Sequence, residues 1–241
     1  MNAIKREFKL HWRKDAILYA IYWGVFTLMV GVVLLIMNLT GSDTYAEMGC
    51  FMSMLVGIVL LLLRFVFWQP YYFNFSVGMG RTRISAMLCT AAHSALLTVL
   101  FAGTLLLFQT IEHNLYPILF PNASNEISLT DIISPGPLAL IAAVLWIVTF
   151  VFSGAIARFG RKAWWAGWTV WMFCCLLLPR LMDSDKENVS LLGRAAQGIF
   201  TAVSGLLGCI APAVWIVLAV LAAAAALSAG VRMYLRAEVR D

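Results

Sequence analysis

The chain has 241 residues, of which 62% are hydrophobic and only 12% are charged, with a mean hydropathy of +0.88. Soluble domains contain about 45–50% apolar and about 25% charged residues, so this composition excludes a soluble globular enzyme, a disordered chain and a nucleic-acid-binding protein. The net charge of +5 is typical of a membrane protein whose basic residues stay on the cytoplasmic side.

A membrane-spanning helix needs about 20 apolar residues, and six runs of about that length follow one another. In lipid the backbone must satisfy its own hydrogen bonds, so each run is predicted to be helical. The first run is longer than a signal-peptide core and precedes no small-residue cleavage site, which predicts a retained anchor. The chain is therefore predicted to be an all-α polytopic membrane protein with a single transmembrane domain over residues 1–241. The predicted spans are 16–39, 48–68, 84–110, 138–157, 163–181 and 210–230.

The distribution of basic residues predicts the orientation. When both termini are placed in the cytoplasm, 14 of the 17 basic residues fall in inner segments, as the positive-inside rule requires. An odd number of spans would break this alternation, so six spans with cytoplasmic N- and C-termini are predicted. The inner basic residues are Lys5, Arg6, Lys9, Arg13, Lys14, Arg64, Arg81, Arg83, Arg158, Arg161, Lys162, Arg232, Arg236 and Arg240, and the outer ones are Arg180, Lys186 and Arg194.

The N-terminal segment 1–15 precedes the first span and mixes basic residues with apolar ones. Ile4, Phe8 and Trp12 recur near helical spacing. This pattern predicts a helix lying in the inner interface, with Phe8 and Trp12 as its apolar anchors. The alternative is a solvated basic tail that only sets the topology.

Two outer segments are less regular than the spans. Residues 112–134 form the longest polar segment, contain Pro117 and Pro121, and are predicted to be irregular. Residues 191–209 are moderately apolar and rich in glycine, and they are interpreted as a re-entrant pair of short helices that requires protein cover. The alternative for 191–209 is a longer last helix that protrudes from the membrane.

No catalytic or metal-binding motif is found. The glycines Gly78 and Gly80 lack the lysine of a phosphate-binding loop, so the chain is predicted not to be an enzyme by itself. Glu112 and His113 are interpreted as a solvated loop feature. His93 is interpreted as a neutral histidine bonded to a neighbouring helix, with a functional intramembrane group as the alternative.

The span centres contain almost no charge, which argues against an ion-coupled transporter. Arg64 and Arg180 lie near predicted span ends, from which their side chains can extend to the interface. The surface between the spans suits an amphipathic or lipophilic cargo.

The inner loop 69–83 combines apolar, aromatic and basic residues. Phe73, Phe75, Val77 and Met79 alternate with small or polar residues, and arginines follow. An apolar patch with a basic end predicts a docking surface for a soluble partner. A plain connecting loop is the alternative.

The residues Ser76-Val77-Gly78-Met79-Gly80-Arg81 resemble the S-x-G-x-[ST]-R pattern of the same loop in permease subunits of ABC-2-type ABC transporters. Gly80 stands where Ser or Thr is common in that family. The resemblance extends to the layout of the chain: an interfacial N-terminal helix, six spans and a broken outer segment before the last span. It is closest to small bacterial permeases made apart from their ATPase, and it implies an ABC-2 exporter-like (type V) transmembrane domain in the bacterial inner membrane.

The resemblance implies partners and a division of labour. Two permeases, identical or homologous, would face each other and bind two ATPase subunits that carry ATP and Mg, whereas this chain would bind no cofactor. ATP-driven closure of the ATPases would export a peptide, lipid or drug-like amphipathic substrate. The implied ATPase-coupling residues are Phe75, Ser76, Val77, Gly78, Met79, Gly80, Arg81 and Arg83.

The same resemblance implies a pathway between the second and fifth spans. For each candidate lining residue, packing in the core or against lipid is the alternative. The alternative function is a non-transporting immunity or sensor subunit that binds a peptide or a lipid without an ATPase. The candidate lining residues are Met52, Leu55, Val59, Leu62, Trp168, Trp171 and Phe173.

Overall fold

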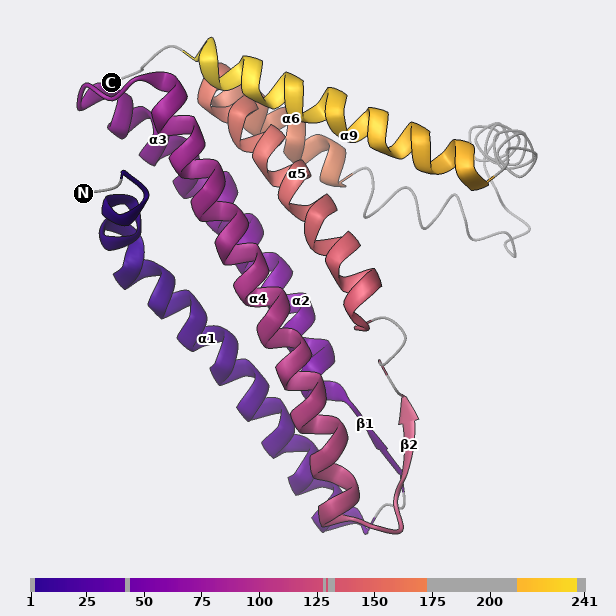
Figure 1. Cartoon of the computed structure of the whole chain (residues 1–241). Coiled ribbons are helices and arrows are strands. Elements are labelled where there is room, and N and C mark those ends of the chain that lie inside the picture. Colours follow the sequence, from indigo (N-terminus) through magenta and orange to yellow (C-terminus); the bar gives the residue numbers. More distant parts are fainter. Residues whose placement is uncertain (1–2, 42–43, 128, 130–132, 173–211, 238–241) are drawn as a thin grey trace. The chain divides into compact units, whose positions relative to one another are not determined.

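The structure is a computed structural model that describes residues 3–41, 44–127, 129, 133–172 and 212–237 (Figure 1). As predicted, these residues are mostly helical, with two short strands besides. In chain order the elements are α1 (Ala3–Thr40), β1 (Thr44–Ala46), α2 (Met48–Leu63), η1 (Arg64–Trp68), α3 (Gln69–Gly78), α4 (Arg83–Leu119), β2 (Ser124–Ile127), α5 (Pro135–Phe159), α6 (Arg161–Met172) and α9 (Pro212–Leu235).

Five helical stretches of the described residues are long and apolar enough to cross a membrane, and they correspond to five predicted spans. For the remaining predicted span, 163–181, the structure describes only the part in α6, and residues 173–181 lie outside the described residues. The predicted re-entrant segment 191–209 also lies outside them, so the count of six spans stays a prediction. The five stretches are His11–Thr40, Met48–Gly78, Arg83–Leu119, Pro135–Phe159 and Ile216–Leu235.

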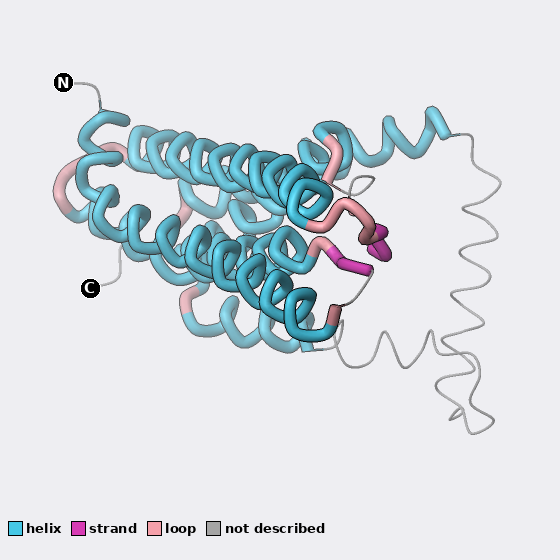
Figure 2. The backbone as a smooth tube through the Cα atoms, turned by 90° about the horizontal axis from the view of Figure 1, so that it is seen from below, coloured by secondary structure: helices cyan, strands magenta, loops and turns pink. Residues whose placement is uncertain are grey.

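The chain divides into two compact units, residues 1–153 with 239–241 and residues 154–238. In the first unit α1, α2 and α4 pack against one another along their lengths. Strands β1 and β2 pair in parallel at the end of these helices opposite the N-terminus (Figures 1 and 2). This pairing joins the connection after α1 to the connection after α4.

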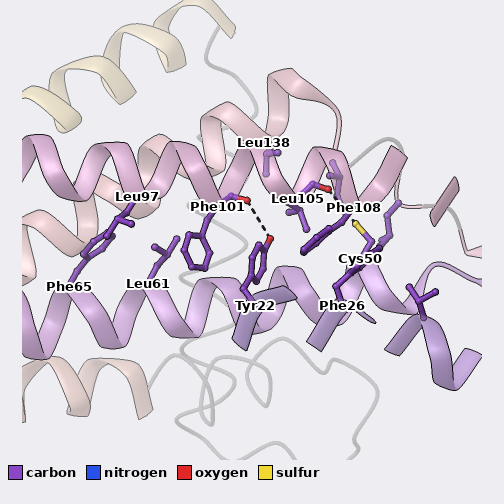
Figure 3. Packing of buried hydrophobic residues seen from close by; sticks show 13 residues of the cluster. Tyr22, Phe26, Cys50, Leu61, Phe65, Leu97, Phe101, Leu105, Phe108 and Leu138 are labelled. Atoms are coloured by element: carbon purple, nitrogen blue, oxygen red, sulfur yellow. Dashed lines mark hydrogen bonds between the residues drawn. The ribbon is translucent and has the colours of Figure 1, made fainter. Parts of the chain in front are cut away.

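Aromatic rings from α1 and α4 form the core of the first unit (Figure 3). Phe26 and Phe108 stack with centroids 4.0 Å apart, and Tyr22 stacks on Phe101 at 4.6 Å. The Tyr22 hydroxyl donates to the Phe101 carbonyl oxygen at 3.4 Å. Helix α2 approaches this core at Gly57, where a Cβ atom would lie 2.9 Å from the Tyr22 ring. Offset and stacked ring pairs add to the free energy of burial.

Helix α1 is continuous from Ala3 to Thr40, so the N-terminal segment is helical as expected but joins the first span without a break, and its place at the membrane interface stays a prediction. No glycine or proline interrupts the sequence before Gly24, and nothing else breaks the backbone hydrogen bonds. At 1.5 Å per residue, the 38 residues of α1 extend about 57 Å, well beyond the hydrocarbon thickness of about 30 Å.

The prediction of a loop over 69–83 is also wrong for most of its length. Helix α3 covers Gln69–Gly78, and together α2, η1 and α3 form one helical stretch of 31 residues, Met48–Gly78. The connection to α4 is a short turn in which Gly80 has φ +87°, a conformation that a side chain disfavours. Thr82 then caps α4 by accepting from the Ser85 N–H at 3.4 Å.

The second span was predicted to end at residue 68, and a widened turn explains why the helix continues through Pro70. Residues Arg64–Trp68 form a π-helical turn directly before α3. Proline has no N–H and its ring collides with the carbonyl of the residue four positions earlier, here Val66. The π turn changes the hydrogen-bond register at this point, which lets the helix pass the proline.

Helix α4 reaches Leu119, with Pro117 in its last turn, and β2 follows. The prediction of an irregular segment over 112–134 is therefore wrong for residues 112–119 and for β2. Pro117 removes one backbone N–H donor from the last turn, and the helix ends two residues later, at Leu119. Pro135 instead is the first residue of α5, which begins three residues before the predicted span 138–157.

In the second unit, the end of α5 packs closely on α9. A Cβ atom at Gly154 would lie 3.1 Å from the Tyr234 ring and 3.2 Å from the Gly230 carbonyl oxygen. Small residues at such crossings let helix backbones approach. Gly160, with φ +60°, makes the turn from α5 to α6.

Candidate functional site

The most concentrated buried charge in the first unit is a three-residue group, the Asp15 cluster, formed by Asp15, Arg64 and His93. Arg64 Nε donates to Asp15 Oδ1 at 2.8 Å, and His93 Nε2 lies 2.9 Å from Asp15 Oδ2. The three side chains come from α1, η1 and α4, and Arg64 and His93 are buried. One carboxylate therefore links three elements that are far apart in the sequence.

Aromatic rings and a second cation surround the Asp15 cluster. The Arg64 guanidinium carbon lies 5.2 Å from the Trp68 ring centroid and 5.4 Å from that of Tyr72, and Lys14 Nζ approaches the same rings at 5.1 and 5.4 Å. His11 meets Tyr72 edge-on at 3.9 Å. Cations over ring faces gain attraction that increases when water is excluded. The arrangement stabilises a net positive charge at this end of the helices.

A cavity of about 10 Å³ lies beside Arg64, about the volume that one water molecule occupies. Arg64 Nη2 is buried and makes no hydrogen bond to the described residues. The lining residues include two histidines, an amide and two hydroxyl groups. They are His11, Arg64, Phe65, Gln69, Tyr72, Thr90 and His93.

The cluster corrects one prediction and confirms another. Arg64 was expected to extend to the interface, but it is buried and paired, because Asp15 of α1 lies opposite it. His93 was expected to bond to a neighbouring helix, and it does, through the same carboxylate.

A second polar group, the carboxylate cap, lies at the opposite end of the same helices and contains Glu47 and Glu112. Glu112 accepts from the Gly49 N–H at 3.0 Å and from the Cys50 N–H at 2.6 Å, and the Tyr116 hydroxyl donates to it at 2.7 Å. These backbone groups are the unsatisfied donors of the first turn of α2. An anionic acceptor there also interacts favourably with the helix dipole.

Glu47 performs a different task in the cap. It precedes α2 without capping it through its own side chain. Its carboxylate instead accepts from Asn125 Nδ2 and from the Leu129 N–H, both at 3.0 Å, and lies 3.1 Å from His113 Nδ1. Glu47 therefore fixes the residues around β2 to the start of α2.

The carboxylate cap corrects the interpretation of Glu112 and His113 as a solvated loop feature. Glu112 is fully buried, whereas the His113 side chain is about half exposed. The helical periodicity of α4 explains this result: Glu112 continues the buried positions Phe101, Leu105 and Phe108, at steps of three and four residues.

The predicted ATPase-coupling residues lie at the end of α3, in the turn, and at the start of α4. Phe75 and Met79 are exposed, and Gly78, Gly80 and Arg83 are also at the surface. Ser76 is buried, while Val77 and Arg81 are intermediate. Of the two predicted interfacial anchors, Trp12 is exposed and Phe8 lies within α1.

The predicted pathway residues divide between two helices and the undescribed part of the chain. Leu55 and Val59 are exposed on α2, and Met52 and Leu62 are half-buried. Trp168 and Trp171 are exposed on α6. Phe173 lies outside the described residues.

Among the described residues, no group of three or more His, Cys, Asp or Glu side chains could hold a metal ion. In the Asp15 cluster the carboxylate pairs with a guanidinium, which carries a positive charge and cannot ligate a metal ion. Its chemistry is instead that of an ion pair that joins helices.

The five long apolar helices define the class as a helical protein that could span a membrane several times. Comparison with protein-family models, curated proteins and solved structures finds no match. The function is therefore argued from the chain itself.

Proposed function

We propose that the chain is the membrane-spanning permease subunit of an ATP-driven ABC transporter of the ABC-2 exporter-like (type V) class. In this proposal two ATPase subunits bind at the turn after α3, and a second permease, the same or a homologous chain, completes the pathway in a bacterial inner membrane with both termini cytoplasmic. The cargo is a peptide, a lipid or a drug-like amphipathic molecule.

The observation that carries the proposal is the continuity of helix from Met48 to Gly78. This stretch joins the turn that resembles the ABC-2 coupling loop to the candidate lining positions Leu55 and Val59. Because a helical stretch, even one that contains a π turn, is stiffer than a loop, a displacement at the turn would move the lining face as well. Met79, which is 73% exposed, offers an apolar contact directly after the end of this helical stretch.

The Asp15 cluster supports a wider coupling. Arg64 lies in the helical stretch Met48–Gly78, and Asp15 joins it to α1 and to His93 of α4. A movement of α3 would therefore be transmitted to two further helices through one ion pair.

The distribution of buried ionisable groups supports an external energy source. Among the described residues of the first unit, the buried charged and histidine side chains lie in or beside the Asp15 cluster and the carboxylate cap, and aromatic and aliphatic side chains fill the core between them. Ion-coupled transporters carry ionisable groups along their pathway, which makes ATP hydrolysis on a partner the simpler source of energy.

The test is co-purification of the chain with the ATPase made from the neighbouring gene. The variant Met79→Asp would introduce a charge at the proposed contact, and at least about a tenfold loss of bound ATPase is expected, because burying an unpaired charge at an interface is strongly unfavourable. Ile118→Asp is the matched control, since Ile118 is 75% exposed and also lies near a helix end.

Retention of the ATPase by Met79→Asp, or equal loss in both variants, would contradict the proposed contact. If no ATPase binds the unaltered chain while the chain binds a peptide or lipid, the immunity or sensor function would replace transport.

A further inference from the structure

One face of α6 forms a hollow that shares only Trp168 with the predicted pathway residues. Arg161, Trp164, Trp165 and Trp168 line a hollow of about 430 Å³. Their spacing of three, four and seven residues from Arg161 places them on one side of the helix. The hollow lies within the second unit and takes no part in the proposed coupling.

The three indole rings form walls at different angles rather than a flat stack. Trp164 and Trp165 have centroids 6.3 Å apart with planes inclined by 37°, and Trp165 and Trp168 are 6.4 Å apart with planes at 78°. Trp165 and Trp168 are exposed. Exposed tryptophan side chains on a helix with basic residues are typical of the membrane–water interface, where one end of the ring is apolar and the N–H is wet.

The charged residues in the described part of the second unit have one sign. The sequence contains no acidic residue between Asp131 and Asp183, and the described part of the second unit, residues 154–172 and 212–237, contains none at all. The close contact of Gly154 with Gly230 and Tyr234 brings the basic ends of α5 and α9 together. The cations of these described segments are Arg158, Arg161, Lys162, Arg232 and Arg236.

We propose that the α6 hollow binds the headgroup of an anionic phospholipid. The Arg161 guanidinium would hold the phosphate with two parallel hydrogen bonds, which is the geometry that arginine favours. The indole rings would cover the glycerol region and the start of the acyl chains. A lipid fits better than a soluble anion because three of the four described side chains that line the hollow are aromatic, and basic pockets of membrane proteins recognise anionic headgroups.

A pair of neighbouring charge variants tests the site. The purified full chain is exchanged into nanodiscs of phosphatidylcholine with increasing phosphatidylglycerol, and the phosphatidylglycerol retained after transfer to detergent is counted by native mass spectrometry. Arg161→Gln and Lys162→Gln remove the same charge from adjacent exposed residues, but only Arg161 lines the hollow. We expect Arg161→Gln to bind about tenfold more weakly than Lys162→Gln, the loss of a charge-assisted contact.

Equal weakening in the two variants would indicate general attraction of cations to an anionic surface and would overturn the site. Equal retention of phosphatidylcholine, or full competition by inorganic phosphate, would overturn the choice of an anionic lipid.

A pair of variants on α6 tests the hollow itself. Trp165 and Val170 are both 63% exposed on the same helix, and only Trp165 lines the hollow. Trp165→Ala should weaken retention about fivefold, whereas Val170→Ala should leave it unchanged. Thermal unfolding checks that both variants fold, and an equal effect of the two would overturn the assignment.

Discussion

The Asp15 cluster and the carboxylate cap bury acidic side chains at opposite ends of the same three helices, but they neutralise them differently. Asp15 faces a guanidinium and an imidazole, so its partners are side chains. Glu112 faces two backbone N–H groups and a phenol. Side-chain partners can exchange while the helices keep their shape, whereas backbone partners fix the position of the helix start.

The comparison indicates at which end a lost partner can be replaced. At the Asp15 cluster, the carboxylate is held by side chains from η1 and α4, which a second substitution can change. At the cap, β1 pairs with β2, Glu112 of α4 bonds to the start of α2, and Glu47 bonds to β2. The cap therefore joins four segments. We expect that the stability lost through a substitution at the cluster can be recovered by a second substitution. We expect that the stability lost through a substitution at the cap cannot.

The largest expected effect is that of Asp15→Ala, which leaves Arg64 buried without its carboxylate. Removing one partner of a buried pair costs about 3–5 kcal/mol, and the measurement is the free energy of unfolding in mixed micelles titrated with dodecyl sulfate. The double variant Asp15→Leu with Arg64→Met should recover most of this loss, because no charge is then left unpaired. A double variant as unstable as the single one would contradict the picture of an exchangeable pair.

Glu112→Gln should have the next largest effect. The amide keeps the shape but offers one acceptor instead of two, so at least one N–H at the start of α2 loses its partner. Loss of a hydrogen bond to a charged group costs about 1.5–3 kcal/mol, measured by the same titration. Asn114→Ala, an exposed change one turn from the C-terminus of α4, should stay within about 0.5 kcal/mol. A neutral result for Glu112→Gln would show that the cap does not need its charge.

Gly49→Ala tests the close packing of the cap. A Cβ atom at Gly49 would lie 2.6 Å from Val30 Cγ2 and 3.1 Å from Glu112 Oε1, so an overpacking cost of about 1–3 kcal/mol is expected. Gly24→Ala is the matched control, since it meets nothing within 4 Å and should stabilise its helix by up to about 1 kcal/mol. Thermal unfolding in detergent distinguishes the two, and a stabilising Gly49→Ala would refute the tight contact.

The smallest expected effect lies between the two ends. The Tyr19 hydroxyl and Thr104 Oγ1 are 2.6 Å apart and join α1 to α4. Interhelical hydrogen bonds in membrane proteins average about 0.6 kcal/mol, so Tyr19→Phe should destabilise by about that amount. Tyr71→Phe, at a residue that is 64% exposed, should have no effect. A loss above about 2 kcal/mol for Tyr19→Phe would mean that the middle of the bundle, and not its ends, holds the helices together.

Long-range apolar periodicity predicted the helices, because the same residues must be apolar to lie in lipid or in the core. It failed where a local signal was overridden: Gln69-Pro70 indicates a helix end, but the π turn absorbs the proline. The polar clusters had no local signal at all. Asp15 meets His93 across 78 sequence positions, and Glu112 meets Gly49 across 63.

A usable signal for Glu112 was nevertheless present. Its position continues the buried positions of α4 at helical spacing, which should have indicated that it points inward. The sequence signal for Asp15 was weaker: it is an acidic residue directly before an apolar run and after five basic residues.

The wide sequence separation within the carboxylate cap also sets the order in which its parts are synthesised and can fold. The first two helices leave the ribosome before the residues that complete them, since Glu47 bonds to Leu129 across 82 positions. At synthesis rates of about 5–20 residues per second, that gap lasts roughly 4–16 s. The start of α2 therefore remains unfinished for seconds during insertion, and the hairpin of α1 and α2 matures only when α4 and the chain beyond it arrive.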